Sequence, residues 1–195
     1  MKQEIAVIVG GGPGISASCA RVFVREGMQV AIAARNINKP VLRELEKTHG
    51  VLLVACDAVD ETSVADLFGL VVERLGNPNL VVHNIDGRTR DIFRKPITEA
   101  APVDVLDTLK NSVYSAFLVG QQAARCLLQN ELGDRGRGSI IFTNASAALK
   151  GYPNSGAFAA ACHGKAGLAQ SMARELMPQG IHVTNVPIDA AIGWT

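Results

Sequence analysis

The length and composition of this chain describe a globular protein of ordinary charge. It has 195 residues, 48% hydrophobic and 19% charged, so one α/β domain with a substantial core is expected. The formal net charge of +1 favours neither nucleic acid nor a membrane surface as a partner. The chain shows no apolar run near transmembrane length and no secretory segment, which indicates a cytoplasmic protein. The four cysteines lack metal-ligand spacing, so reduced thiols and no metal site are expected.

A glycine-rich turn near the N-terminus is the most informative feature of the chain. Ile5 to Val9 reads as a strand that is buried on both faces. Gly10, Gly12 and Gly14 follow, and then a helical pattern from Ile15 to Glu26. Glycines in such a turn let backbone N–H groups and a helix N-terminus approach a pyrophosphate, because no Cβ holds the phosphate off. The turn therefore predicts dinucleotide binding, and a tight connection without a ligand is the alternative.

The rest of the chain alternates between strand-like and helical patterns. This alternation predicts right-handed βαβ units, and hence a parallel sheet with helices on both faces. The expected fold is a single doubly wound, three-layer α/β domain of the Rossmann type, residues 1–195, with strand order 3-2-1-4-5-6. Further strands are expected at Gln29–Ala34, Val51–Ala55, Asn79–Asn84, Ser139–Thr143 and His182–Val186, and helices at Lys39–Thr48, Glu61–Leu75, Val103–Gln129 and Ser155–Met177.

Five segments follow one another in an order typical of one family. They are VGGGPGIS (9–16), CDAVD (56–60), LVVHNID (80–86), GSIIFTNASA (138–147) and AQSMARELMPQGIHVTNV (169–186). Together they resemble the short-chain dehydrogenase/reductase family along essentially the whole chain. The resemblance implies hydride transfer between a nicotinamide dinucleotide and a carbonyl or alcohol. It also implies a homodimer or homotetramer, formed through the two long helices.

The resemblance assigns cofactor contacts to several positions. Asp57 holds the position that usually hydrogen-bonds the adenine amino group, and the alternative is that it only caps its own turn. Asn84 is placed beside the adenosine ribose. The cofactor-binding set implied is Gly10, Gly12, Gly14, Ile15, Arg35, Asp57, Ala58 and Asn84.

Three residues depart from the family pattern near this set. Ser16 replaces the third glycine of the turn, and its Cβ is expected to loosen the packing of helix on strand. Asp86 replaces the glycine of the family motif NNAG and brings a carboxylate near the phosphates. His83 replaces the first asparagine, and we interpret it as a buried structural residue.

The end of the second strand bears on the choice between NAD and NADP. An NAD site needs an acidic residue there to accept hydrogen bonds from the ribose hydroxyls, and Ala34 cannot do so. Arg35 follows, and a guanidinium suits a 2′-phosphate. NADP is therefore expected, with NAD possible, because Pro13 stands where many NADP-preferring members have a second basic residue. A solvated arginine is the alternative interpretation of Arg35.

The catalytic positions depart most from the family. Its members use a Tyr-x-x-x-Lys motif on one helix, a serine about thirteen residues before the tyrosine, and an asparagine. Counted back from AQSMAREL without gaps, the tyrosine falls on Phe158, the lysine on Cys162 and the serine on Ala145. The asparagine falls on Asn111 or on Ser112. A positioned acid–base group contributes about 10²–10⁴ in rate, so ordinary carbonyl reduction is expected to be severely weakened.

Lys165 is the candidate to replace the missing lysine. It follows Cys162 by three residues and Phe158 by seven, so it lies on nearly the same helical face. A surface or subunit-contact lysine is the commoner alternative. Cys162 beside His163 also suggests a nucleophile, but adjacent helical residues diverge and a small buried cysteine is more usual.

Two functions remain open from the sequence. One is an NADP-linked oxidoreductase with a degenerate catalytic site, and the other is a catalytically silent nucleotide-binding protein with a regulatory or structural role. Substrate specificity in the family comes largely from a segment after the sixth strand. The chain ends at Thr195, where that segment would begin, so it is expected to be missing.

Overall fold

The strands form one parallel sheet, as the apolar runs predicted. The computed structural model describes residues 3–190 and 192, so the end of the chain at Thr195 lies outside the described residues. The strands are β1 (Ile5–Val9), β2 (Gln29–Ala34), β3 (Leu52–Ala55), β4 (Leu80–His83), β5 (Gly138–Ala145) and β6 (Ile181–Ile188).

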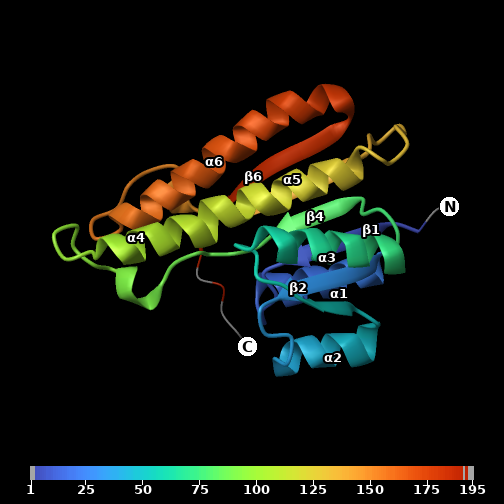
Figure 1. The fold of residues 1–195 in the computed structure, drawn as a ribbon, viewed down its shortest axis with the longest axis horizontal. Helices are drawn as coiled ribbons and strands as arrows, with labels where there is room; N and C mark the ends of the chain where they lie inside the picture. The colour runs from blue at the N-terminus through green and yellow to red at the C-terminus, as the bar shows by residue number, and fades with distance from the viewer. Residues whose placement is uncertain (1–2, 191, 193–195) are drawn as a thin grey trace.

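The strand order is β3-β2-β1-β4-β5-β6, and every neighbouring pair is parallel (Figure 1). The predicted order 3-2-1-4-5-6 is confirmed. β1 and β4 are adjacent, with Val7 paired to Ala31 on one side and to Val81 on the other. The chain leaves β1 toward one edge of the sheet and β4 toward the other. This is the switch point at which doubly wound sheets bind ligands, outside the carboxyl ends of the strands.

The helices lie between the strands within one to three residues of the predicted ranges, with one exception. The segment predicted as one helix from 103 to 129 is interrupted by a π-helical turn, Lys110–Tyr114. The α-helices are α1 (Ile15–Arg25), α2 (Pro40–His49), α3 (Glu61–Arg74), α4 (Pro102–Leu109), α5 (Ser115–Leu127) and α6 (Gly156–Leu176). Of the helices described, none is long and apolar enough to cross a bilayer.

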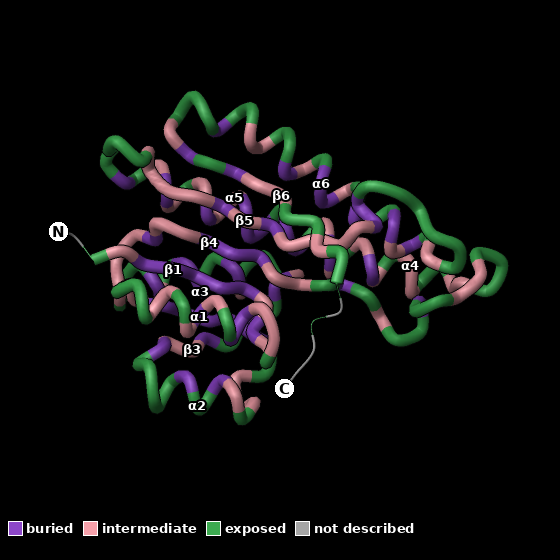
Figure 2. Tube along the Cα trace, turned by 180° about the vertical axis from the view of Figure 1, so that it is seen from behind, coloured by how far each residue is buried: buried purple, intermediate pink, exposed green. Residues whose placement is uncertain are grey.

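Alternate residues of the buried strands feed two separate cores, one on each face of the sheet. Val7 and Val9 of β1 face α3, α5 and α6, whereas Ala6 and Ile8 face α1 and α2. This follows from the period of two along a strand. Figure 2 shows the buried strands enclosed between partly exposed helices. The continuous apolar run of β1 is therefore explained by helices on both sides.

A chain of hydrogen bonds ties the switch point together. The Ser16 hydroxyl donates to the carbonyl oxygen of Gly10 at 2.8 Å and accepts from Asn84 Nδ2 at 2.7 Å. Asn84 Oδ1 accepts in turn from the Thr143 hydroxyl at 2.8 Å. The expectation that Ser16 loosens the packing is wrong, because its side chain is 1% exposed and joins α1 to the ends of β1 and β4.

Removing the Ser16 hydroxyl should cost stability. In Ser16→Ala the part-buried amide of Asn84 loses its acceptor, and an unsatisfied donor shielded from water costs about 1–3 kcal/mol. We expect the free energy of unfolding, measured with urea, to fall by that amount. Ser18 is exposed on the same helix, so Ser18→Ala is the control and should change it by less than about 0.5 kcal/mol. Equal effects of the two substitutions would show that the hydrogen bonds of Ser16 do not stabilise the fold.

Candidate functional site

A groove of about 390 Å³ lies at the carboxyl ends of the strands on the β3 side of the switch point. We call it the cofactor groove. The strands end here in the glycine turn, in Arg35, in Asp57 and in Asn84, so residues distant in sequence meet at one edge of the sheet. The groove is lined by Val9–Gly11, Ala33–Asn36, Lys39, Cys56–Val59, Asn84–Arg88, Asn111 and Ser115.

Each glycine of the turn is explained by a different feature of its surroundings. Gly10 has φ +105°, and a Cβ there would overlap the carbonyl oxygen of Asn84. The chain just after β4 therefore leaves room only for a glycine at position 10. A Cβ on Gly12 would meet no atom within 4 Å, so this position keeps space open. Gly14 is the N-cap of α1, and Ile15 begins the helix and lines a second cavity. Gly10 lines the groove directly, whereas Gly12 and Gly14 lie beside it along the turn.

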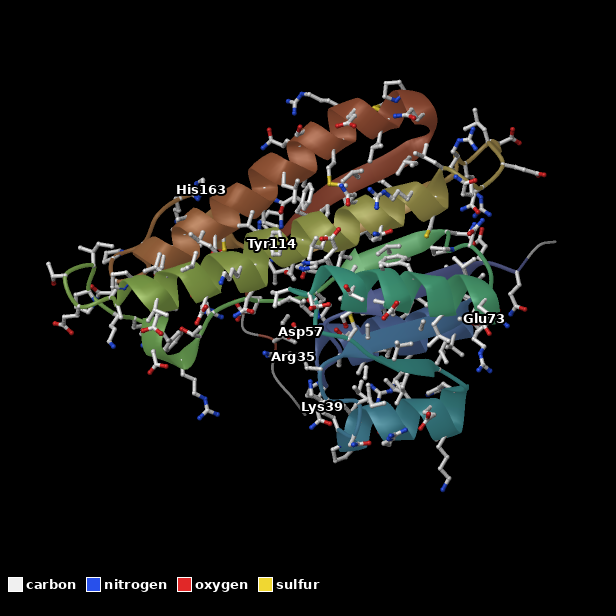
Figure 3. All side chains as sticks on the ribbon, in the orientation of Figure 1. Arg35, Lys39, Asp57, Glu73, Tyr114 and His163 are labelled. Atoms are coloured by element: carbon white, nitrogen blue, oxygen red, sulfur yellow. The ribbon has the colours of Figure 1, made fainter. Side chains whose placement is uncertain are left out.

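Two basic side chains border the groove where β2 ends. Arg35 and Lys39 both line it, and the Lys39 ammonium donates to the carbonyl oxygen of Gly11 at 2.6 Å. Figure 3 shows Arg35, Lys39 and Asp57 near one another at this end of the sheet, beside α2. The sequence analysis missed Lys39. Its signal was its position, immediately before the proline that begins α2 and four residues after Arg35.

Asp57 and Ala58 line the groove just after the end of β3. The Asp57 side chain is exposed and accepts a hydrogen bond from the N–H of Val59 at 3.3 Å. Its backbone N–H donates to Ser63 Oγ at 3.0 Å, which fixes the loop before α3. Asp57 therefore caps its own turn, as one of the two sequence interpretations predicted, and it also lines the groove.

Hydrogen bonds of the side chain and of the backbone hold Asn84 in place. Its amide oxygen and nitrogen are both bonded within the protein, to Thr143 and Ser16. Its backbone N–H donates to the carbonyl oxygen of Val9 at 2.7 Å. The residue lines both the cofactor groove and the second cavity. It is thus a fixed wall between the two spaces.

The second cavity measures about 460 Å³, and we call it the lysine cavity. It lies between the ends of β4 and β5 and the first turns of α6. One lysine is set among mainly apolar residues there. The lining residues are Ile15, Asn84–Asp86, Arg88, Thr143–Ala145, Phe158, Cys162, Lys165, Ile188, Ala190 and Ile192.

Lys165 is buried, so its interpretation as a surface lysine is wrong. The residue is 2% exposed, and its ammonium donates to the carbonyl oxygens of Ile85 at 2.8 Å and Thr143 at 3.3 Å. Desolvation by burial lowers the pKa of Lys165 to about 8 from 10.5, and Cys162 and Asp86 oppose this shift. The ungapped count placed the family lysine at Cys162, but the cation of this cavity comes from Lys165.

The other two α6 residues of the cavity carry no exchangeable hydroxyl. Phe158 lies under the guanidinium of Arg88, whose carbon is 4.3 Å from the ring centroid. Burial raises the pKa of the Cys162 thiol, which argues against a thiolate nucleophile. His163 lies on the outer side of α6, with Nδ1 2.9 Å from the carbonyl oxygen of Ala159 (Figure 3). Ala145 lines the cavity without a hydroxyl group.

The π-helical turn separates the two asparagine candidates. Asn111 lines the cofactor groove, and its carbonyl oxygen accepts from the Ser115 hydroxyl at 2.6 Å. Ser112 is fully buried against Gly87, and its hydroxyl has no hydrogen-bond partner in the described part of the chain. Of the two, Asn111 is the residue at the groove.

Asp86 and His83 are the two remaining departures from the family pattern, and both have polar partners within the protein. Asp86 pairs with the Arg88 guanidinium through contacts of 2.7–3.0 Å, so its carboxylate is largely compensated. His83 is fully buried, with Nε2 2.9 Å from Ser115 Oγ. Burial and the nearby Lys165 hold its pKa well below the usual value, so the ring is neutral. Across residues 3–190 and 192, no group of three His, Cys, Asp or Glu side chains is placed to hold a metal ion.

A family model described as enoyl-(acyl carrier protein) reductase matches residues 10–189. The chain belongs to the short-chain dehydrogenase/reductase family. It is 27% identical over 187 residues to 3-oxoacyl-[acyl-carrier-protein] reductase from Bos taurus, covering 94% of this chain and 74% of that protein. It is 28% identical to an uncharacterized oxidoreductase from Thermotoga maritima, covering all of this chain and 72% of that one.

Solved structures agree with this membership. A short-chain dehydrogenase from Rhodopseudomonas palustris superposes with a TM-score of 0.81 and 33% identity, over 95% of this chain and 85% of that one. An actinorhodin polyketide ketoreductase bound to NADPH superposes with a TM-score of 0.83 and 26% identity, over 95% of this chain and 69% of that one. In this family the enzymes are oxidoreductases, and the sheet described above is their shared fold.

The buried charge of Lys165 should make stability depend on pH. Below pH 8 both the folded and the unfolded chain carry this proton, so the folded state bears the full cost of a desolvated ammonium. Between about pH 8 and 10.5 the unfolded chain holds more of the proton, so stability rises with pH. We expect Lys165→Met to be more stable than the unmutated protein at pH 7, by up to about 3 kcal/mol.

This difference should shrink as the pH rises from 8 to 10.5. Urea unfolding at several pH values measures it. Lys47→Met, at an exposed position of α2, is the control and should show no such dependence. A difference between Lys165→Met and the unmutated protein that stays constant from pH 7 to 10.5 would contradict the lowered pKa.

Proposed function

We propose that the protein is an NADP-linked oxidoreductase that transfers a hydride between the cofactor and a carbonyl or alcohol. The observation that carries this is the arrangement of three cations. Arg35 and Lys39 border the outer end of the cofactor groove, and Lys165 is buried in the adjoining lysine cavity. Asn84, Ile85, Asp86 and Arg88 line both spaces, so the groove and the cavity adjoin each other.

The residues present fit a dinucleotide. Arg35 and Lys39 would hold the 2′-phosphate, Asp57 the adenine, and the backbone from Gly10 to Ile15 the pyrophosphate. Lys39 supplies the second basic group that Pro13 does not, which strengthens the case for NADP. The nicotinamide end would lie toward Lys165, where the cofactor supplies or accepts the hydride. The protein's part is to orient that end, exclude water and hold a proton nearby.

The relatives support a carbonyl substrate. Two of the four proteins named above are, by their names, a 3-oxoacyl-[acyl-carrier-protein] reductase and a polyketide ketoreductase. Both names describe reduction of a keto group. We propose the same reaction class for this chain, with the particular carbonyl left open.

A catalytically silent nucleotide-binding protein is the second candidate. Its support is Phe158, which lines the lysine cavity where the family motif requires a tyrosine hydroxyl. Counting four residues back from Lys165 gives Ala161, which is buried and also has no hydroxyl. The two functions separate in one experiment, in which NADPH binding is titrated first. NADPH oxidation is then followed with butanone and ethyl acetoacetate as probes. Binding without oxidation of either probe favours the silent protein.

NADP should bind more tightly than NAD. Arg35 and Lys39 can pair with the extra phosphate, whereas Ala34 offers the ribose hydroxyls no acceptor. We expect Arg35→Ala and Lys39→Ala each to weaken NADP binding about tenfold or more, in line with about 1.5–3 kcal/mol for a charged hydrogen bond. NAD binding should change little. Calorimetric titration of both cofactors tests this, and equal affinities of the unmutated protein for the two would rule it out.

We also propose a homodimer or homotetramer that forms through α4 and α5. Large apolar side chains are exposed on this part of the molecule, which is unusual unless a partner covers them. We expect light scattering at micromolar concentration to give at least twice the mass of one chain, and Phe117→Asp to lower it. A monomer of the unmutated protein would contradict the proposal. The exposed residues are Val103, Leu106, Tyr114 and Phe117.

A further inference from the structure

Reduction of a carbonyl needs a proton for the oxygen, and the lysine cavity offers few sources. Of the side chains that line it within the described residues, only Asp86, Arg88, Cys162 and Lys165 titrate. Asp86 and Arg88 are paired with each other. Burial raises the pKa of the Cys162 thiol, which makes it a poor acid near neutral pH. Lys165 remains.

The hydrogen bonds of Lys165 leave one proton unassigned. An ammonium has three N–H donors, and two of them are directed at the carbonyl oxygens of Ile85 and Thr143. In the described ranges no carboxylate forms an ion pair with Lys165. Both partners are therefore neutral acceptors that hold the nitrogen in place without capturing its proton. The third N–H is left for a group that enters the cavity.

The surroundings of Lys165 favour release of this proton. His83 on β4 is neutral, Cys162 lies one turn earlier on α6, and Asp86 and Arg88 on the loop after β4 compensate each other. The remaining neighbours are mainly apolar, so the charge is poorly solvated. Burial accordingly brings the pKa of Lys165 to about 8, where a general acid is effective near neutral pH.

We propose that Lys165 is the proton donor of this site, in the place that a tyrosine occupies in the family. This rests on the proposed hydride transfer. A bound reduced nicotinamide dinucleotide would supply the hydride for the carbonyl carbon. The C–O π electrons would then move to the oxygen, and an Nζ–H bond of Lys165 would break to form the O–H bond. The products are the alcohol, the oxidised cofactor and a neutral amine, which takes a proton from water. Oxidation of an alcohol runs the same steps in reverse.

A rival donor lies in a neighbouring cavity of about 500 Å³. Tyr152 lines it and its hydroxyl is 3.2 Å from Ser146 Oγ. That cavity shares Arg88, Ala145 and Phe158 with the lysine cavity, but Lys165 does not line it. Tyr152 has a cation of its own nearby, since Lys150 Nζ lies 5.2 Å from the centroid of its ring. Tyr152→Phe therefore belongs in the test.

The experiment compares Lys165→Ala, Lys165→Arg and Tyr152→Phe, with Lys150→Ala as the control for an exposed lysine. Turnover of ethyl acetoacetate is measured at saturating NADPH, and NADPH binding is followed separately by nicotinamide fluorescence. We expect both Lys165 variants to lose about 10²–10⁴ in turnover, the usual contribution of a general acid. Lys165→Arg should retain NADPH binding, because it keeps the charge, and still fail as an acid.

Chemical rescue separates proton donation from a structural role. Ethylammonium should enter the space left in Lys165→Ala and raise the turnover of this variant at least tenfold. It should not change the turnover of Lys165→Arg. In the unmutated protein, turnover should fall tenfold per pH unit above about pH 8. One resonance of [ε-¹³C]lysine-labelled protein should titrate at that pH and be absent in Lys165→Arg. This readout needs no turnover.

The outcomes are distinct. Turnover that persists in Lys165→Ala, or that is lost in Tyr152→Phe and not rescued in Lys165→Ala, overturns the role of Lys165 and leaves the oxidoreductase proposal standing. Binding of NADPH with no turnover by the unmutated protein overturns both. A lysine resonance that titrates only above pH 10 removes the physical basis for the acid.

Discussion

The hydrogen-bonded tie at the switch point is the interaction on which the site depends. Ser16, Asn84 and Thr143 come from α1 and from the ends of β4 and β5, and each side chain is bonded to the next. The chain leaves β1 toward one edge of the sheet and β4 toward the other, so a crevice opens outside the carboxyl ends of these two strands. The tie closes this opening with side chains, so the cofactor groove and the lysine cavity share a fixed wall.

The same wall holds the buried lysine. The carbonyl oxygens that accept from Lys165 belong to Ile85, next to Asn84, and to Thr143, which bonds Asn84 through its hydroxyl. Loosening the tie would therefore move both acceptors of the ammonium. A buried ammonium without its hydrogen bonds is far more costly than one with them. The same hydrogen bonds thus stabilise the switch point and position the ammonium of Lys165.

The sequence predicted the fold well because each strand is marked by local pattern and the order follows from the βα alternation. It predicted the site less well because side-chain direction depends on packing. Cys162 and Lys165 share a helical face, so the spacing could offer Lys165 only as a possible substitute; its burial and its hydrogen bonds to Ile85 and Thr143 come from packing. The π-helical turn at Asn111 was also invisible, because its apolar spacing resembles that of an α-helix. Lys39 reaches the groove through the conformation of the loop after β2, and its place directly before the proline of α2 was the signal for it in the sequence.

The retained lysine also bears on the choice between an enzyme and a silent protein. A desolvated ammonium is costly to keep, and apolar residues of similar volume would fill the space at lower cost. Such local conflicts with stability are expected at functional sites. Phe158 points the other way, because it removes a hydroxyl and leaves an apolar ring under Arg88. The ring is also part of the apolar lining of the lysine cavity, however, and burial in that cavity is what lowers the pKa of Lys165 to about 8. The substitution that removes the usual acid thus helps to make another.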